Sequence, residues 1–134
     1  MAFAQSAGSR GASVKERAEQ AAQKVGARRW ATSTEEAVKD DAVNAVSICL
    51  PHALHEAHAL IAAKAGKHIL VEKPMAISLR ECDSMIAAAQ AAKVTLMVGQ
   101  VLRFREANRE ARRLIRSGAI GKPTNVIRRR HSFT

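Results

Sequence analysis

Short apolar runs separated by helix-length segments constrain the fold of this chain more than any other feature of its sequence. The runs occupy residues 29–31, 43–50, 68–71 and 94–98, and each is too short to form a buried helix. Strands with so little polar alternation are typical of a parallel sheet that is covered on both faces. Because helical segments separate the runs, we expect an α/β fold with a doubly wound parallel sheet and right-handed crossovers.

The pattern Ser-x-x-Glu, which is typical of a helix start, occurs at Ser13, Ser33 and Ser78. It predicts helices over 14–25, 34–39 and 79–92. A fourth helix is expected over 54–65 and a basic one over 103–117, with a further strand over 124–130. The residues expected to form buried helix faces are Leu54, Ala57, Ile61, Ala62 and Ala65, and then Leu79, Cys82, Ile86 and Ala89.

The composition is that of a soluble globular protein, with 47% hydrophobic and 25% charged residues in a chain of 134. No apolar stretch approaches the roughly 20 residues that cross a bilayer, so we expect no membrane partner. Cys49 and Cys82 lie within apolar patterns. We therefore expect buried free thiols in a reducing cytoplasm rather than a disulfide.

The net charge of +10 is concentrated near the C-terminus, where residues 103–134 carry ten of the 22 Lys and Arg residues and two of the twelve acidic ones. A basic tail of this kind favours a nucleic-acid partner. The aromatic content of 3% and the lack of tyrosine argue against that partner, because few side chains are left for base stacking.

Polar and charged residues follow two of the apolar runs directly. The run 43–50 leads into Pro51-His52-Ala53-Leu54-His55, and the run 68–71 leads into Glu72-Lys73-Pro74. Ligands of open α/β sheets bind outside the carboxyl ends of the strands. These two segments are therefore the first candidates for a functional site.

The same segments resemble the N-terminal half of the Gfo/Idh/MocA family of nicotinamide-dependent oxidoreductases. Its signature is a buried strand followed by Pro-x-x-x-His, then Ala-Gly-Lys-His, then Glu-Lys-Pro, and all three motifs occur here. The resemblance implies a Rossmann-like fold, but the glycine-rich loop and first strand of relatives have no counterpart. We therefore expect a domain truncated at both ends, with a partial nucleotide-binding domain over 1–122 and the start of a truncated C-terminal α/β domain over 123–134.

The resemblance also implies roles for individual residues. Lys73 would be the catalytic residue that hydrogen-bonds the reacting oxygen of the substrate, with Glu72 orienting it or its loop. A cis Lys73–Pro74 bond is expected. The implied cofactor-binding residues are Ser9, Arg10, Leu50, Pro51, His52, His55, Glu72, Lys73 and Arg103.

The identity of the cofactor depends on the segment Gly8-Ser9-Arg10, which would end the second strand of the family fold. Relatives that bind NAD often carry an acidic residue there, and no acidic residue precedes Glu16. Arg10 suits the 2′-phosphate of NADP, so NADP is the preferred cofactor and NAD the second choice. The alternative is that Arg10 is a solvated turn residue.

Three histidines, His52, His55 and His58, are spaced three residues apart, which raises the question of a metal site. No cysteine or carboxylate cluster accompanies them to complete a tetrahedral ligand set. We expect no metal, and we expect His55 to serve as a cap or packing residue if it is not a cofactor contact.

The full-length form is expected to be an NAD(P)-dependent oxidoreductase that transfers a hydride from a secondary alcohol of a sugar, cyclitol or related small molecule. The chain alone is expected to be weakly active or inactive. The alternatives are a catalytically inactive Rossmann-like interaction module and a basic nucleic-acid-binding domain. Loss of the first strand would leave sheet edges open, so self-association is also expected.

Overall fold

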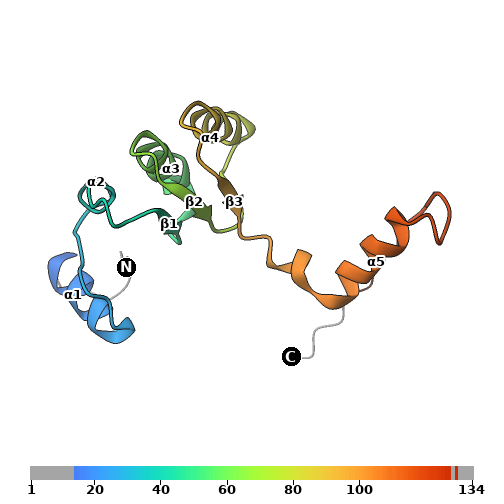
Figure 1. The fold of residues 1–134 in the computed structure, drawn as a ribbon, viewed down its shortest axis with the longest axis horizontal. Coiled ribbons are helices and arrows are strands. Elements are labelled where there is room, and N and C mark those ends of the chain that lie inside the picture. Colours follow the sequence, from blue (N-terminus) through green and yellow to red (C-terminus); the bar gives the residue numbers. More distant parts are fainter. Residues whose placement is uncertain (1–13, 128, 130–134) are drawn as a thin grey trace. The chain divides into compact units, whose positions relative to one another are not determined.

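The computed structural model describes residues 14–127 and 129 of the chain (Figure 1). The chain divides into two compact units, Met1–Gly99 and Gln100–Thr134. The first contains the helices α1 (Val14–Val25), α2 (Thr34–Val38), α3 (His55–Lys64) and α4 (Leu79–Ala91), the strands β1 (Ala45–Ile48), β2 (His68–Val71) and β3 (Leu96–Val98), and the 3₁₀ turn η1 (His52–Leu54). The second contains the 3₁₀ turn η2 (Val101–Phe104) and the helix α5 (Glu106–Arg116).

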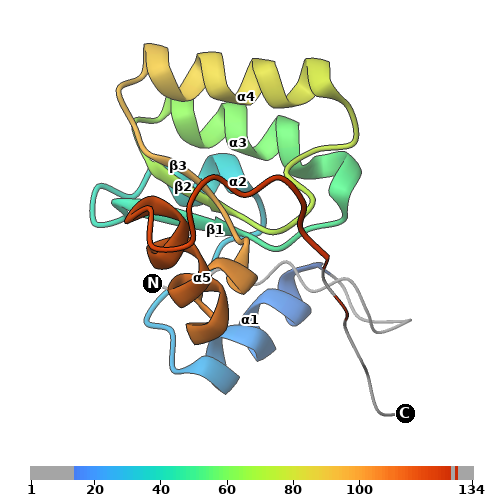
Figure 2. The ribbon, with the colours of Figure 1, turned by 90° about the vertical axis from the view of Figure 1, so that its right-hand side faces the viewer.

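The three strands form a parallel sheet in the order β1-β2-β3, which confirms the expected Rossmann-like α/β class. Ile48 pairs with Val71, and Val71 pairs with Val98, so the three strands end level with one another. The helix α3 connects β1 to β2 and the helix α4 connects β2 to β3. Figure 2 shows both helices side by side on one face of the sheet.

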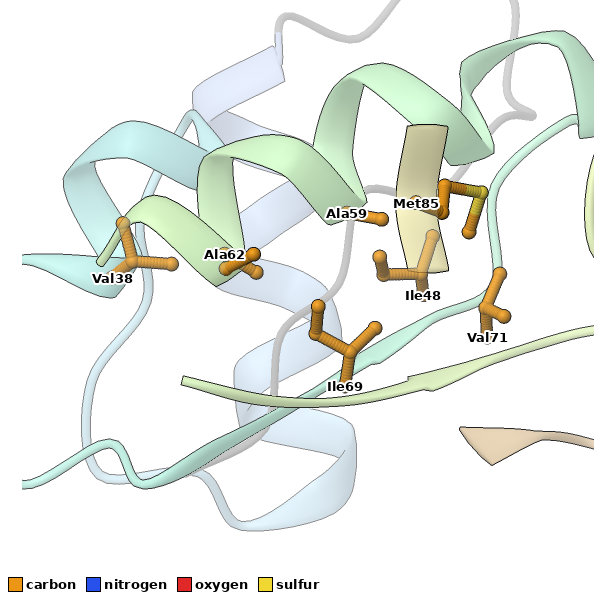
Figure 3. Close-up of a cluster of buried hydrophobic side chains, with 8 residues drawn as sticks. Val38, Ile48, Ala59, Ala62, Ile69, Val71 and Met85 are labelled. Atoms are coloured by element: carbon orange, nitrogen blue, oxygen red, sulfur yellow. The ribbon is translucent and has the colours of Figure 1, made fainter. Parts of the chain in front are cut away.

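The core lies between that face and the two helices (Figure 3). The strands contribute Ile48, Ile69 and Val71, and α4 contributes Met85. The facing residues of α3 are small, which lets the helix backbone approach the sheet closely. They are Ala59, Ala62 and Ala63.

The opposite face of the sheet is more open to solvent. Alternate strand residues point to opposite faces, and Leu70 and Met97, which alternate with the core residues, are 41% and 44% exposed. Ser47 and Cys49, which alternate with Ile48 along the chain, are also exposed.

Cys49 and Cys82 are free thiols, as expected, but neither is buried. Cys49 is exposed and Cys82 is half-buried.

Two expected strands are not formed. Residues 29–31 adopt irregular structure, and so do the described residues of the segment 124–130. In the first case Arg29 and Trp30 are exposed, and the Arg29 guanidinium pairs with the Asp40 carboxylate at 2.7 Å. The segment therefore buries too little apolar surface to favour strand pairing.

The expected helix starts at Ser33 and Ser78 are confirmed, while Ser13 lies outside the described residues. The Ser33 and Ser78 hydroxyls accept the backbone N–H groups of Glu36 and Glu81, at 3.1 and 3.3 Å. In each case the glutamate carboxylate accepts the backbone N–H of the residue before the serine. Glu36 accepts from the Thr32 N–H at 2.9 Å, and Glu81 accepts from the Ile77 N–H at 3.1 Å. The Thr32 N–H bond and a second one from the Thr32 hydroxyl lower the pKa of the Glu36 carboxyl.

The expected buried faces of α3 and α4 were partly wrong. On α4 the fully buried residues are Met85 and Ala89, whereas Leu79 is 83% exposed and Ile86 is also exposed. On α3 the buried residues are His55, Ala59, Ala62 and Ala63, while Leu54, Ala57 and Ala65 are exposed. Both helices are rich in alanine, so the pattern of large apolar residues did not identify the side that packs closely.

In the second unit, the basic helix expected over 103–117 is divided into η2 and α5. Gly118, with a φ of +72°, follows the last turn of α5 in the left-handed conformation that suits glycine. The Arg113 guanidinium donates two hydrogen bonds to the Glu110 carboxylate, from Nε at 2.8 Å and from Nη2 at 2.6 Å. In the described part of the chain, no helix is both long enough and apolar enough to cross a membrane.

Candidate cofactor and substrate site

The carboxyl ends of the three strands bring the predicted segments of the first unit to one edge of the sheet. The Glu72 N–H donates to the Ile48 carbonyl at 2.9 Å, and the Gly99 N–H donates to the Val71 carbonyl at 2.8 Å. The strand pairing therefore continues one residue past β2 and β3. Leu50-Pro51, Glu72-Lys73 and Gly99 follow the three strand ends in the chain.

Glu72 holds the backbone at the end of β2. Its carboxylate oxygen Oε2 accepts the backbone N–H of Lys73 at 3.1 Å. A Cβ atom placed on Gly99 would lie 3.5 Å from the same oxygen, so the carboxylate lies beside the end of β3. The Glu72 carboxylate therefore bonds to the backbone of Lys73, and its role in orienting the loop stays a prediction.

Lys73 is exposed, and its ammonium forms no hydrogen bond or ion pair with any of the described residues. The peptide bond between Lys73 and Pro74 is cis, as predicted. A free ammonium at a strand end can donate a hydrogen bond to a carbonyl, hydroxyl or phosphate oxygen of a ligand. Its assignment as the catalytic residue stays a prediction.

His55 lies at the start of α3 and is completely buried, with 0% of its surface exposed. Its Nε2 atom lies 2.9 Å from the Leu50 carbonyl oxygen, and its Nδ1 atom lies 3.0 Å from the Pro74 carbonyl oxygen and 3.3 Å from that of Met75. The ring therefore joins the loop after β1 to the loop after β2. Its membership of the cofactor site stays a prediction.

The other residues of the first loop are more exposed. Pro51 accepts the Leu54 N–H at 2.9 Å in the 3₁₀ turn η1, and Leu50 is half-buried. The exposed ring of His52 meets the His55 ring edge-on, with the ring centres 5.7 Å apart. His52 is exposed, and its ring nitrogens can hydrogen-bond a ligand.

His58 points away from this cluster, since its Nδ1 atom lies 2.6 Å from the Thr34 hydroxyl. Within the part of the chain that the structure describes, no three His, Cys, Asp or Glu side chains are arranged to hold a metal ion.

Three predicted site residues are not placed beside Lys73. Ser9 and Arg10 lie outside the described residues. Arg103 is an exposed residue of η2 in the second unit, whose placement relative to the first unit is not defined. Their cofactor contacts stay predictions.

Residues beyond the predicted set also belong to this edge of the sheet. Gly99 lies beside the Glu72 carboxylate, and the carbonyl groups of Pro74 and Met75 contact His55. Gly99 could have been found from the sequence, because it directly follows the apolar run 94–98. Backbone carbonyls that face a buried histidine leave no signal in the sequence.

Residues 11–100 match the family model described as an oxidoreductase family with an NAD-binding Rossmann fold. Over 110 residues the chain is 37% identical to the scyllo-inositol 2-dehydrogenase (NAD(+)) of Bacillus subtilis, and the match covers 82% of this chain and 32% of that enzyme.

Solved structures of similar proteins show the same fold. A probable dehydrogenase from Thermotoga maritima has a TM-score of 0.76 and 30% sequence identity, over 83% of this chain and 34% of that protein. The WlbA dehydrogenase of Bordetella pertussis, solved with NADH and UDP-GlcNAcA, has a TM-score of 0.73 and 28% identity, over 80% of this chain and 31% of that protein. The chain thus spans about a third of the length of these relatives.

Proposed function

The chain belongs to the Gfo/Idh/MocA family of oxidoreductases, and from this premise we propose that it forms part of the nicotinamide and substrate site of a dehydrogenase. The reaction is hydride transfer between the nicotinamide and a secondary alcohol of a sugar, cyclitol or related small molecule. The scyllo-inositol dehydrogenase and the enzyme solved with UDP-GlcNAcA support this substrate class. The chain alone is expected to be weakly active or inactive.

The observation that supports the proposal best is the state of Lys73. Its backbone is held by Glu72 at the carboxyl end of the central strand, while its ammonium is free of partners among the described residues. A lysine paired within the fold would have to lose a bond before it could bind a ligand. The free ammonium is instead ready to donate to an incoming oxygen atom.

A bound nicotinamide supplies the hydride acceptor for the oxidation of an alcohol. The chain's own contribution is to hold the alcohol oxygen through the Lys73 ammonium, which stabilises negative charge on that oxygen as its proton passes to solvent. In the reverse direction the same ammonium polarises the carbonyl group. Glu72 acts on the loop through the Lys73 N–H and takes no proton from the substrate.

The test is a calorimetric titration of the chain with NAD(H) and NADP(H), carried out on the wild type, Lys73→Met and Lys64→Met. Lys64 is an exposed lysine at the end of α3 and serves as the matched control. We expect cofactor binding that Lys73→Met weakens and Lys64→Met leaves unchanged. Equal affinities in all three proteins would contradict the role of Lys73.

NADP is the cofactor we propose, because Arg10 can pair with a 2′-phosphate and no acidic residue precedes Glu16. The name of the scyllo-inositol dehydrogenase specifies NAD(+) for that enzyme. The titration distinguishes the two, since Arg10→Ala should weaken NADPH binding and leave NADH binding unchanged. We also propose the cytoplasm as the compartment, on the basis of the free thiols of Cys49 and Cys82.

A second function, an interaction module that pairs with a second copy of the chain, is favoured by the open edge of β1. The Asn44 and Ile48 carbonyls accept from β2, so by the alternation of parallel strands the peptide groups of Ala45 and Ser47 face the other edge. No strand of the described residues pairs there. An unpaired strand edge is a template for another chain.

Sedimentation velocity tests this second function. We expect the chain to associate with rising concentration, and Ser47→Lys to shift it towards monomer because charge on an edge strand opposes pairing. Gln90→Lys adds the same charge to an exposed position of α4 and is the control. A wild-type chain that stays monomeric at high concentration would rule out this association.

A further inference from the structure

The buried imidazole of His55 is the structural link between the two loops of the candidate site. It is the one buried polar or charged side chain within the described part of the chain, with 0% exposure. Burying a polar ring is costly unless its nitrogen atoms are hydrogen-bonded. Both nitrogens of His55 lie within hydrogen-bond distance of backbone oxygens.

The partners of the ring are all carbonyl groups, which only accept hydrogen bonds. On one side Nε2 faces Leu50, at the end of β1. On the other side Nδ1 faces Pro74 and Met75, which follow Lys73 directly. The Nδ1 side therefore acts on the backbone that carries the proposed catalytic lysine.

The segment from Lys73 to Met75 lies outside any helix or strand, so sheet pairing does not hold it. Two side chains bond to its backbone. Glu72 accepts the N–H of Lys73, and His55 contacts the two carbonyl groups that follow. Without His55, the chain after Lys73 would lose its hydrogen-bonded anchor to α3 and keep only the apolar packing of Met75 and Ala76 against the core.

We propose that His55 is a positioning residue, which donates from Nδ1 to the carbonyl groups of Pro74 and Met75 and thereby sets the place of the Lys73 ammonium. This inference rests on the proposed function of Lys73. A displacement of about 1 Å in a catalytic group can cost roughly a hundredfold in rate. A residue that never touches the substrate can therefore control the reaction through this loop.

Two substitutions separate the two sides of the ring. The amide nitrogen of asparagine is as many bonds from Cα as Nδ1, and that of glutamine is as many bonds from Cα as Nε2. His55→Asn can therefore keep the donor that faces Pro74 and Met75, whereas His55→Gln places its donor on the opposite side, towards Leu50. Both variants lose similar ring packing, so a difference between them reports on the hydrogen bonds.

Hydrogen–deuterium exchange of the full chain is the readout, since it needs no cofactor. We expect exchange of the Lys73 amide, which Glu72 protects, to rise roughly tenfold in His55→Gln, because the loop loses one hydrogen-bonded anchor, and to stay close to wild type in His55→Asn. Equal exchange of the Lys73 amide in the two variants would overturn the proposal.

Cofactor titration of the same proteins distinguishes the inference from the function on which it rests. If the wild type binds NADPH, His55→Gln should weaken binding more than His55→Asn does. If the exchange pattern holds but no protein binds a nicotinamide dinucleotide, the proposed function fails and the anchoring of the loop stands.

Nitrogen NMR of the wild-type His55 ring provides a test that does not depend on the variants folding. We expect Nδ1 to carry a proton that exchanges slowly with solvent. A bare lone pair on Nδ1 would overturn the proposal, because such a nitrogen cannot donate to a carbonyl group.

Discussion

The packing of α4 leads to a quantitative prediction about which of its residues stabilise the fold. Met85 is 1% exposed and belongs to the core cluster with Ile48 and Val71, whereas Leu79 is 83% exposed on the same helix. Replacing a buried methionine by alanine removes transfer free energy and leaves a cavity, and such changes cost about 2–5 kcal/mol. We expect Met85→Ala to lower the free energy of unfolding by about 3 kcal/mol.

The same helix provides the control. Leu79→Ala removes a side chain of similar size from an exposed position, so its effect should stay within about 0.5 kcal/mol. Since domains are stable by only about 5–15 kcal/mol, the difference between the two variants is large. Urea unfolding followed by far-ultraviolet circular dichroism measures it. Comparable destabilisation by the two variants would refute the packing of α4 described above.

Three further predictions concern local features of the first unit. Ser78→Ala should lower the free energy of unfolding by about 1 kcal/mol, measured by urea unfolding, because the cap of α4 is lost. The Glu36 carboxyl has its pKa lowered in the folded state by the N–H and hydroxyl of Thr32, so its stabilising effect is present above the unfolded pKa and is lost as the pH falls through the folded pKa. Glu36→Gln should therefore flatten the acid side of the stability profile, and an unchanged profile would contradict this. Glu72→Ala should speed amide exchange at Lys73, measured by NMR, while Glu72→Gln, which keeps an acceptor oxygen, should change it less.

Much of the first unit could be predicted from the sequence, because its signals are local. The runs 43–50, 68–71 and 94–98 contain the three strands, and the serines at 33 and 78 mark the starts of α2 and α4. Each signal depends on a few neighbouring residues whose chemistry has one stable arrangement.

The buried helix faces could not be predicted as well, because alanine fits both a core and a surface. In α3 the choice between Ala57 and Ala59 depends on the distance to β1 and β2, which periodicity does not contain. The prediction of a strand over 29–31 was wrong, because Arg29 and Trp30 are exposed and the run buries too little apolar surface to favour strand pairing.

The sequence pointed to the charged residues of the candidate site, but it could not show which backbone groups they contact. Glu72, Lys73 and the cis bond to Pro74 came from the family motif. The contacts of His55 with the carbonyl groups after Lys73 join residues that are 19 and 20 positions apart, and only the folded sheet brings them together.

We propose that the carboxyl edge of this sheet binds a nicotinamide dinucleotide beside Lys73. The most direct measurement is NMR mapping of the isotope-labelled chain with NADP(H) and NAD(H). We predict shifts that saturate and cluster at His52, Glu72, Lys73 and Gly99, with little change along the exposed side of α4. Saturable binding that leaves these residues unchanged, or no binding to a folded chain, would contradict the account.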